Sequence, residues 1–207
     1  MKREIIFIII LVLLFFLISS VSFAQAPVAT GTPSVYKVTL KRFRISSDNG
    51  ATWTTVKEGT VEFDIASVDA GATVGNFFAG SIIPGTYNRI EHTISATFKM
   101  EGYIIDAVGT TDYYTSTTAA NGTNSMENFD INNPPADYGE ASITVFGYNE
   151  GEDLPAGAEA VNIVVEKGVA RKVNINFDVT NTLNLYNMGG GVFRLMPGEP
   201  TVTVSVE

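Results

Sequence analysis

Apolar and polar residues alternate with a period of two along most of the chain after residue 35. The alternation is clearest between Arg89 and Met100, where every second side chain is apolar except for His92. Because successive side chains of a strand point to opposite faces, such a stretch has one apolar face and one polar face. The same pattern recurs in shorter stretches at 36–40, 60–65, 161–165, 173–179 and 202–206. It predicts an antiparallel sheet that is buried on one side.

The phase of the alternation changes within the first long strand. Apolar side chains occupy even positions from residue 36 to residue 40, whereas Phe43 and Ile45 occupy odd positions. One extra residue in a strand produces such a change, because it turns every later side chain to the other face. The sequence therefore predicts a β-bulge near Lys41 and Arg42.

No stretch after residue 25 keeps the 3.6-residue period of an amphipathic helix, although 66–80 is compatible with a short helix or an ordered loop. Turns rich in Gly and Pro separate the strands. We therefore expect an all-β fold: a single antiparallel β-sandwich over 35–207, with Greek-key connections of the immunoglobulin or transthyretin kind. Residues 25–34, rich in Ala, Pro, Thr and Gly, are expected to form a flexible lead-in to this domain.

One long stretch departs from the alternation. Residues 109–137 are rich in Thr, Asn and Gly, surround a few aromatic residues and end in Asn132-Asn133-Pro134-Pro135. We expect a long loop excursion from the sandwich there. Long loops on a rigid scaffold are a common place for binding sites.

Residues 1–24 have the three parts of a secretory signal peptide. A basic start at Lys2 and Arg3 precedes an uncharged apolar run, which ends in small residues. Signal peptidase recognises this arrangement, with Ser22 and Ala24 at the third and first positions before the cut. We expect a signal helix that is cleaved after Ala24, and an extracytoplasmic protein that is periplasmic, surface-bound or secreted. An uncleaved membrane anchor is the alternative, although the run is short for the roughly 20 residues that span a bilayer.

The charge and the cysteine content narrow the function classes. The chain has 13 Lys and Arg residues against 22 Asp and Glu residues. Cleavage after Ala24 removes Lys2, Arg3 and Glu4 and leaves 11 basic and 21 acidic residues, a net charge near −10. An acidic surface repels phosphate backbones and argues against nucleic-acid partners. With no cysteine, the chain has no disulfide, no thiolate metal site, no thiol nucleophile and no lipid anchor on a leader cysteine.

Residues 46–53 fit the pattern S-x-D-x-G-x-T-W, which resembles the Asp-box of sialidase-type propellers and of some unrelated β proteins. In that motif a serine and an aspartate, here Ser46 and Asp48, organise the turn through hydrogen bonds. Gly50 would take a backbone conformation that other residues avoid, and Trp53 would pack back over the hairpin. A propeller carries one copy in each blade, whereas this chain has one copy. The motif therefore predicts a structural hairpin and not sialidase activity.

His92 is the only histidine, and the alternation places it on the inward face of its strand. One histidine without cysteine does not make an ordinary zinc site. No Gly-x-Ser-x-Gly elbow or other marked nucleophile accompanies it. We expect a buried structural role for His92, and the sequence indicates no catalytic residue.

Acidic and amide residues cluster in two stretches, 127–140 and 149–153. Oxygen ligands of this kind on loops are what calcium binds. The candidate calcium ligands are Asp130, Asp137, Glu140, Glu152 and Asp153. Neither stretch has the D-x-D-x-D-G spacing of a known calcium loop, so solvated acidic loops are the alternative. Apart from calcium, no cofactor is indicated.

Four aromatic residues stand in or beside the predicted excursion: Tyr113, Tyr114, Phe129 and Tyr138. Exposed rings can stack on sugar faces or anchor a partner protein. They can equally form a small hydrophobic cluster that orders a long loop. These four residues are the candidate ligand-binding set.

Several short stretches carry a family resemblance. Residues 83–90 read IPGTYNRI, 166–168 precede the alternation at 173–178, and 194–197 precede the alternation at 202–204. In these stretches the chain resembles a family of bacterial exported β-sandwich domains of unknown function, the DUF 4382 group. The resemblance implies this fold and an address outside the cytoplasm, and it carries over no catalytic residue. Many members of that family are anchored through a cysteine after the leader, which this chain lacks.

Three hypotheses for the function follow. The first is a non-catalytic extracytoplasmic module that binds a glycan or a surface protein through the aromatic-bearing loop. The second is a polysaccharide hydrolase that uses a pair of the loop carboxylates. The third is a structural subunit of a surface assembly. We favour the first, because the sequence contains no set of residues that indicates a particular catalytic reaction.

Overall fold

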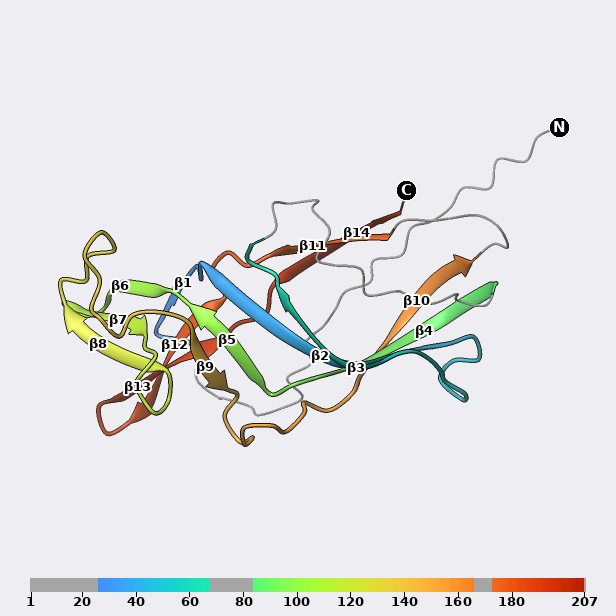
Figure 1. Ribbon diagram of the computed structural model, residues 1–207, viewed down its shortest axis with the longest axis horizontal. Coiled ribbons are helices and arrows are strands. Elements are labelled where there is room, and N and C mark those ends of the chain that lie inside the picture. Colours follow the sequence, from blue (N-terminus) through green and yellow to red (C-terminus); the bar gives the residue numbers. More distant parts are fainter. Residues whose placement is uncertain (1–25, 68–83, 166–172, 207) are drawn as a thin grey trace.

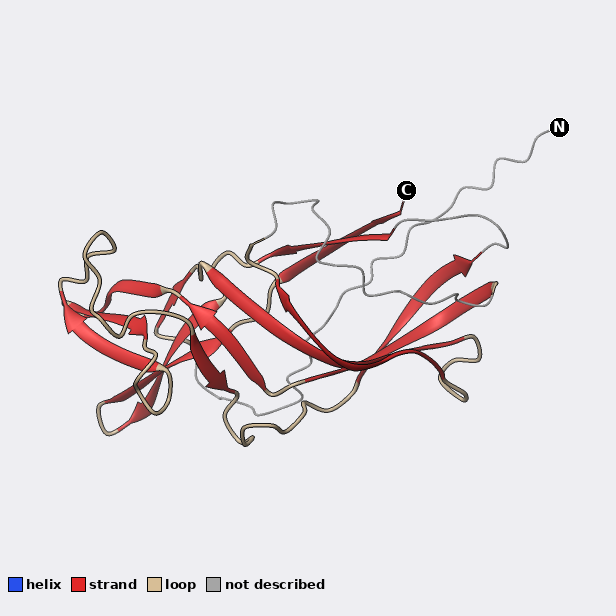
Figure 2. Ribbon diagram, in the orientation of Figure 1, coloured by secondary structure: helices blue, strands red, loops and turns tan. Residues whose placement is uncertain are grey.

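The computed structural model describes residues 26–67, 84–165 and 173–206. Over these residues the chain forms fourteen strands and no helix (Figure 2), so the expected all-β fold is confirmed. Accordingly, this part of the chain contains no helix of the length and apolar character needed to cross a membrane. The predicted signal helix and nearly all of the 66–80 segment lie outside the described residues.

One large sheet runs along the molecule (Figure 1). Its strands are β2 (Val35–Ser46), β3 (Thr54–Asp64), β4 (Gly85–Ile94), β5 (Thr97–Glu101), β9 (Ala141–Thr144) and β10 (Gly157–Val165). All of their pairings are antiparallel. β2 is central: β3 pairs along one of its edges, while β5 and then β4 pair along the other. β9 and β10 lie outside β5 and β4, so they form one edge of the sheet and β3 forms the other.

Two smaller sheets form a second layer over one half of the large sheet (Figure 1). One consists of β1 (Ala29–Gly31), β12 (Leu183–Gly189) and β13 (Val192–Pro197), and the other of β6 (Tyr103–Val108), β7 (Thr111–Thr115) and β8 (Thr123–Glu127). A separate ladder pairs β11 (Val173–Asp178) with β14 (Thr201–Val206). The arrangement is an antiparallel β-sandwich, as the alternation predicts.

The segment expected to be a flexible lead-in contributes β1. This strand pairs with β12, and Ala29 lies opposite Leu185. The backbone of Gly31 packs so closely on β6 that a Cβ atom at this position would lie 2.8 Å from the carbonyl oxygen of Tyr103. Part of 25–34 is thus a strand, because pairing with a strand more than 150 residues away decides its conformation.

The stretch 109–137 is not a single loop. β7 and β8 lie within it; β7 pairs with β6 along one edge and with β8 along the other. The threonines and tyrosines of β7 favour strand geometry, whereas the Asn and Gly content of the whole stretch led to the expectation of a loop. Loops and turns occupy 117–122 and 128–137.

The main hydrophobic core lies between the two layers. Its most completely buried side chains are Tyr36, Phe98, Met100, Ile143, Leu183, Leu185 and Leu195. They come from β2, β5 and β9 in one layer and from β12 and β13 in the other. Burial of each large apolar side chain stabilises the fold by roughly 1.5–3 kcal/mol. The one polar atom among them, the Tyr36 hydroxyl, donates to the Gly198 carbonyl at 2.8 Å.

β2 also reaches a second, smaller core at the far end of the large sheet. Its pairing with β3 and with β4 shifts register between Leu40 and Arg42, which confirms the predicted bulge. Beyond the bulge, Phe43 packs against a cluster of four buried residues: Ile45, Tyr87, Ile90 and Val161. The extra residue therefore lets one strand contribute to both cores.

The alternation from 89 to 100 predicts one strand, and the structure divides it into β4 and β5. At the break the Ala96 N–H donates to the Glu152 carbonyl, and the Leu154 N–H donates to the Ile94 carbonyl, both at 2.9 Å. The loop before β10 thus supplies backbone partners where the ladder is interrupted. The inward phase of the apolar side chains continues through the break, which is why the sequence pattern does not reveal it.

Candidate functional site

The turn between β2 and β3 has the geometry that the Asp-box pattern predicts. The Asp48 carboxylate accepts hydrogen bonds from the Ser46 hydroxyl at 2.6 Å and from the N–H and hydroxyl of Thr52 at 2.9 and 2.5 Å. These bonds, with that from Ser46 first, lower the pKa of Asp48 to about 2. Gly50 has a φ of 88°, and a Cβ atom there would lie 3.2 Å from the Trp53 ring. The turn is a structural hairpin.

An ion-pair network joins this hairpin to β4. The Arg44 guanidinium carbon lies 5.4 Å from the centroid of the Trp53 ring. Arg44 donates to both carboxylate oxygens of Glu91, through Nε at 2.7 Å and Nη2 at 2.6 Å, and Glu91 is buried. Arg42 makes a longer contact of 3.5 Å with the same carboxylate. All of these contacts are internal, so we assign the network a structural role.

His92 is buried, as its place in the alternation predicts. Gly157 of β10 packs flat against the imidazole, because a Cβ atom at that position would lie 2.7 Å from Cε1 of His92. Burial lowers the pKa of His92, which favours the neutral ring. Its Nδ1 has no hydrogen-bond partner among the described residues. Burial and the close packing against Gly157 are the geometry of a packed core histidine.

The four predicted ligand-binding aromatics separate into two places. Tyr113 faces the main core, where its ring centroid lies 5.3 Å from that of Phe193. Tyr114, the next residue in β7, faces the opposite side of the strand, because strand side chains alternate. The set is therefore not one surface, and Tyr113 is not placed to contact a ligand.

The other three rings join Tyr103 in an aromatic cluster on the outer side of β6 and β7. Phe129 is its centre: its ring centroid lies 4.7 Å from Tyr103, 5.5 Å from Tyr114 and 5.2 Å from Tyr138. Tyr114 and Phe129 are only 3 % and 8 % exposed, so their faces are not open to a sugar. The cluster orders the segments around β7 and β8, which is the alternative that the sequence left open.

The five candidate calcium ligands do not come together. In the described part of the chain, no three acidic or histidine side chains are placed to hold a metal ion. Asp137 accepts hydrogen bonds from Asn124 Nδ2 at 3.0 Å, Ser116 Oγ at 2.7 Å and Tyr114 Oη at 3.2 Å. These bonds, led by the one from Asn124, lower the pKa of Asp137. The Asp137 carboxylate thus links β7, β8 and the loop that follows them through hydrogen bonds.

Each of the other four predicted ligands has a partner within the protein. Glu140 pairs with Lys37, and Asp153 pairs with Lys41. Glu152 accepts hydrogen bonds from the N–H and side chain of Asn149, and Asp130 accepts them from the N–H and side chain of Asn132. The predicted calcium site is therefore not assembled among these residues. Their carboxylates instead form ion pairs with lysines or hydrogen bonds with asparagines of local turns.

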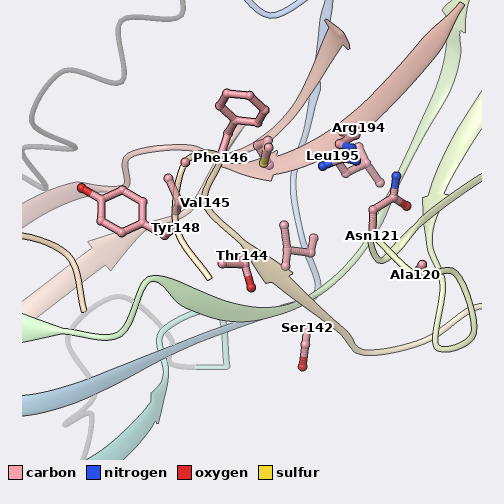
Figure 3. Close-up of a pocket in the computed structure, with 12 residues that line it drawn as sticks. Ala120, Asn121, Ser142, Thr144, Val145, Phe146, Tyr148, Arg194 and Leu195 are labelled. Carbon is pink, nitrogen blue, oxygen red and sulfur yellow. The ribbon is translucent and has the colours of Figure 1, made fainter. Parts of the chain in front are cut away.

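A groove of about 500 Å³ lies between β9 and β13 (Figure 3). Ser142 and Thr144 of β9 form its floor, Phe146 and Tyr148 lie at one end, and Arg194 of β13 lies at the other with Asn121. Among the described residues, none that lines the groove is Asp or Glu. The groove thus combines polar, aromatic and cationic groups on secondary structure that the core holds in place.

The floor of the groove is a free strand edge. β9 pairs with β5 on one side and with no described strand on the other. The Val145 N–H donates to the Ala96 carbonyl at 2.9 Å, so it points toward β5. Because consecutive N–H groups of a strand point to opposite edges, the N–H and C=O of Thr144 point into the groove. At Ser142 this edge is covered by Gly122. The two backbones pack so closely that a Cβ atom on Gly122 would lie 3.3 Å from the Ser142 carbonyl oxygen.

Arg194 is the one charged residue among the described residues that line the groove. Its Nε is buried and has no hydrogen-bond partner among the described residues, and it forms none of the ion pairs found in this part of the chain. This is unusual in so acidic a chain. From Met100 to Glu166 the sequence contains twelve acidic residues and no Lys, Arg or His, so Arg194 brings the positive charge to an otherwise acidic region.

The sequence gives little indication of this groove. The edge position of β9 depends on which strands pair, and the alternation does not specify pairing. Arg194 comes from a strand 50 residues beyond β9 in the chain. The nearest local signal is the pair Phe146 and Tyr148, aromatic residues directly after an apolar strand; Phe146 is 44 % exposed.

The chain was compared with protein families, with curated proteins and with solved structures, and no significant match was found in any of the three. The resemblance to the DUF 4382 group therefore stays a prediction, and the function is argued from the groove alone.

Proposed function

We propose that the protein is a non-catalytic extracytoplasmic binding module, which holds a segment of a glycan or of a protein partner in the groove between β9 and β13. The observation that carries the proposal is the composition of the groove. It offers backbone groups on β9 that no described strand takes up, the aromatic residues Phe146 and Tyr148, and the guanidinium of Arg194, which forms none of the ion pairs among the described residues. A few directed polar groups beside aromatic rings are typical of binding sites.

The hydrolase hypothesis has less support. Glycoside hydrolysis in most families needs two carboxylates that face each other across the bond to be cleaved. No carboxylate of the described ranges lines the groove, and the acids predicted for this role are bound to internal partners. The described residues thus offer no such pair, and no specific observation favours catalysis.

The test is a binding and turnover assay on residues 25–207. The protein is incubated with a panel of cell-wall and plant polysaccharides and with immobilised unfolded polypeptides, and both co-sedimentation and released reducing ends are recorded. We expect binding without release. The double substitution Tyr148→Ala with Arg194→Gln should reduce binding by about tenfold or more.

Ile105→Ala serves as the matched control, because Ile105 is an exposed apolar residue of β6 and does not line the groove. It should bind like the unchanged protein, and thermal unfolding should show that all variants are folded. Release of reducing ends would revive the hydrolase. Equal binding by the groove variant and the control would show that the groove is not the site.

A further inference from the structure

We infer that the ligand of the groove is an extended polypeptide segment, which adds as a new strand to the free edge of β9 and places one carboxylate on Arg194. The inference rests on the proposed function and names the class of ligand that the groove binds. Three features of the groove lead to it: the hydrogen-bonding pattern of its floor, its charge and its length.

The hydrogen-bonding pattern is that of a strand edge. Thr144 presents an N–H and a C=O together, side by side on an extended backbone, and no described strand takes them up. An extended polypeptide carries the same pair of groups at every second residue on the same edge, so it matches this pattern without a specific side chain. Sugar hydroxyls have no such regular spacing.

The charge selects the side chains of the ligand. Arg194 pairs with no carboxylate in the part of the chain that the structure describes, and guanidinium groups bind carboxylates through paired hydrogen bonds. The 100–166 stretch, which contains β9, carries acids and no bases. A strongly acidic ligand would be repelled by this region, so the matching segment has one carboxylate and is otherwise uncharged or basic.

The length of the groove sets the length of the segment. Its floor and the loop that follows span residues 142–148, with Arg194 and Asn121 on one side of the groove and Phe146 and Tyr148 on the other (Figure 3). The extended part of this floor ends at Val145, because a turn at 146–147 follows, in which the Tyr148 N–H donates to the Val145 carbonyl at 3.1 Å. At about 3.3 Å per residue, about four residues of an extended segment lie along this edge. Phe146, exposed at its end of the groove, provides an apolar surface for a side chain of the segment.

The experiment uses a set of fluorescein-labelled peptides of about nine residues, long enough to span the groove. Each alternates threonine and valine and carries a single glutamate, at a different position in each peptide. Binding to residues 25–207 is measured by fluorescence anisotropy. The best peptide is then compared with its glutamine version, which should bind roughly tenfold more weakly. It is also compared with two N-methylated versions. One is methylated on the odd-numbered residues of the peptide and the other on the even-numbered residues.

One N-methylated version should lose binding, because methylation removes the N–H groups that face β9. The version methylated in the other phase should retain it. If both versions bind like the parent peptide, the segment does not add to a strand edge and the inference is overturned. This comparison uses the unchanged protein, so it does not depend on whether a variant folds.

Two pairs of measurements on the protein complete the test. Thr144→Pro removes the groove-facing N–H and should abolish peptide binding, whereas Thr144→Val keeps this N–H and should bind normally; both lose the hydroxyl that bonds Thr97. Arg194→Gln should bind the glutamate and glutamine peptides equally. Retained discrimination in Arg194→Gln would contradict the role of this residue.

The outcomes separate the inference from the proposed function. If polysaccharides bind in the groove and no peptide binds, the groove is a binding site and the polypeptide inference is wrong. If neither class of ligand binds, the proposed function itself is wrong.

Discussion

Two regions of the molecule are organised by aspartates in different ways. In the hairpin at 46–53, the donors to the Asp48 carboxylate lie within four residues of it. In the region of β6, β7 and β8, the donors to Asp112 lie 6 and 17 residues away. Those to the Asp137 carboxylate lie 13 to 23 residues away.

The comparison shows what each network can stabilise. The Asp48 network closes within one turn, and the turn contacts β4 through Asn88, which accepts the Asn49 N–H at 3.0 Å and donates to the Ser47 carbonyl at 3.2 Å. We therefore expect its opening to disturb this end of the sheet and not the main core. The Asp112 and Asp137 networks connect strands and loops that are distant in the chain, and they surround the aromatic cluster. Such a region opens only as a cooperative unit. We therefore expect substitutions around β7 to affect global stability and substitutions in the hairpin to act locally.

The largest effect is expected from Phe129→Ala. It removes the central ring of the aromatic cluster, which contacts three tyrosines and is 8 % exposed. The free energy of unfolding should fall by about 3–5 kcal/mol, since a buried ring is replaced by a cavity. Urea unfolding followed by circular dichroism measures it, with Ile105→Ala as the exposed control. A loss of less than about 1 kcal/mol would mean that the cluster is not part of the cooperative fold.

A smaller loss should follow from Asp112→Ala. The buried Asp112 carboxylate accepts the N–H of Asp106 and the N–H of Phe129, both at 2.6 Å. Asp106 has a φ of 47°, so this carboxylate also holds a strained backbone position. Leaving two N–H groups without an acceptor should cost about 2–4 kcal/mol. Asp112→Asn, which keeps an acceptor oxygen, should lose less in the same unfolding experiment; equal losses would rule out this explanation.

In the hairpin, Trp53→Ala should lower the free energy of unfolding by about 1 kcal/mol, through loss of the ring that lies over Arg44. Trp53→Phe keeps an aromatic face and should lose less. Amide hydrogen exchange tests the comparison directly. It should accelerate in 46–53 and stay unchanged in β7; faster exchange in both regions would show that the hairpin is coupled to the main core.

The smallest effect is a pH dependence of the hairpin. The pKa of Asp48 is lowered to about 2 by its hydrogen bonds, whereas an ordinary aspartate titrates near 4. Its stabilising contribution is therefore present above the ordinary value and is lost as the pH falls from about 4 to about 2. Trp53 is the only tryptophan, so its fluorescence reports this opening. Asp48→Asn should remove the transition, and its persistence in that variant would assign it to another group.

The same contrast explains how much could be predicted from the sequence. The strand alternation, the bulge after Leu40 and the turn around Asp48 depend on neighbouring residues, and all three were predicted. The strand at Ala29, the burial of Phe129 and the free edge of β9 depend on pairings between distant segments. No local pattern encodes those pairings, so the loop expected at 109–137 and the calcium site expected from its acids were both drawn from composition alone.

The free edge of β9 has a further consequence for the protein in solution. An exposed strand edge can form backbone hydrogen bonds with the same edge of a second molecule, which is a common route to aggregation. Here β9 lies within a stretch of twelve acidic and no basic residues, so two such edges that approach each other repel. The protection is electrostatic, and it weakens as ionic strength rises, because the screening length is only about 8 Å at physiological ionic strength and shorter above it. Concentrated protein should therefore stay monomeric most readily in dilute buffer.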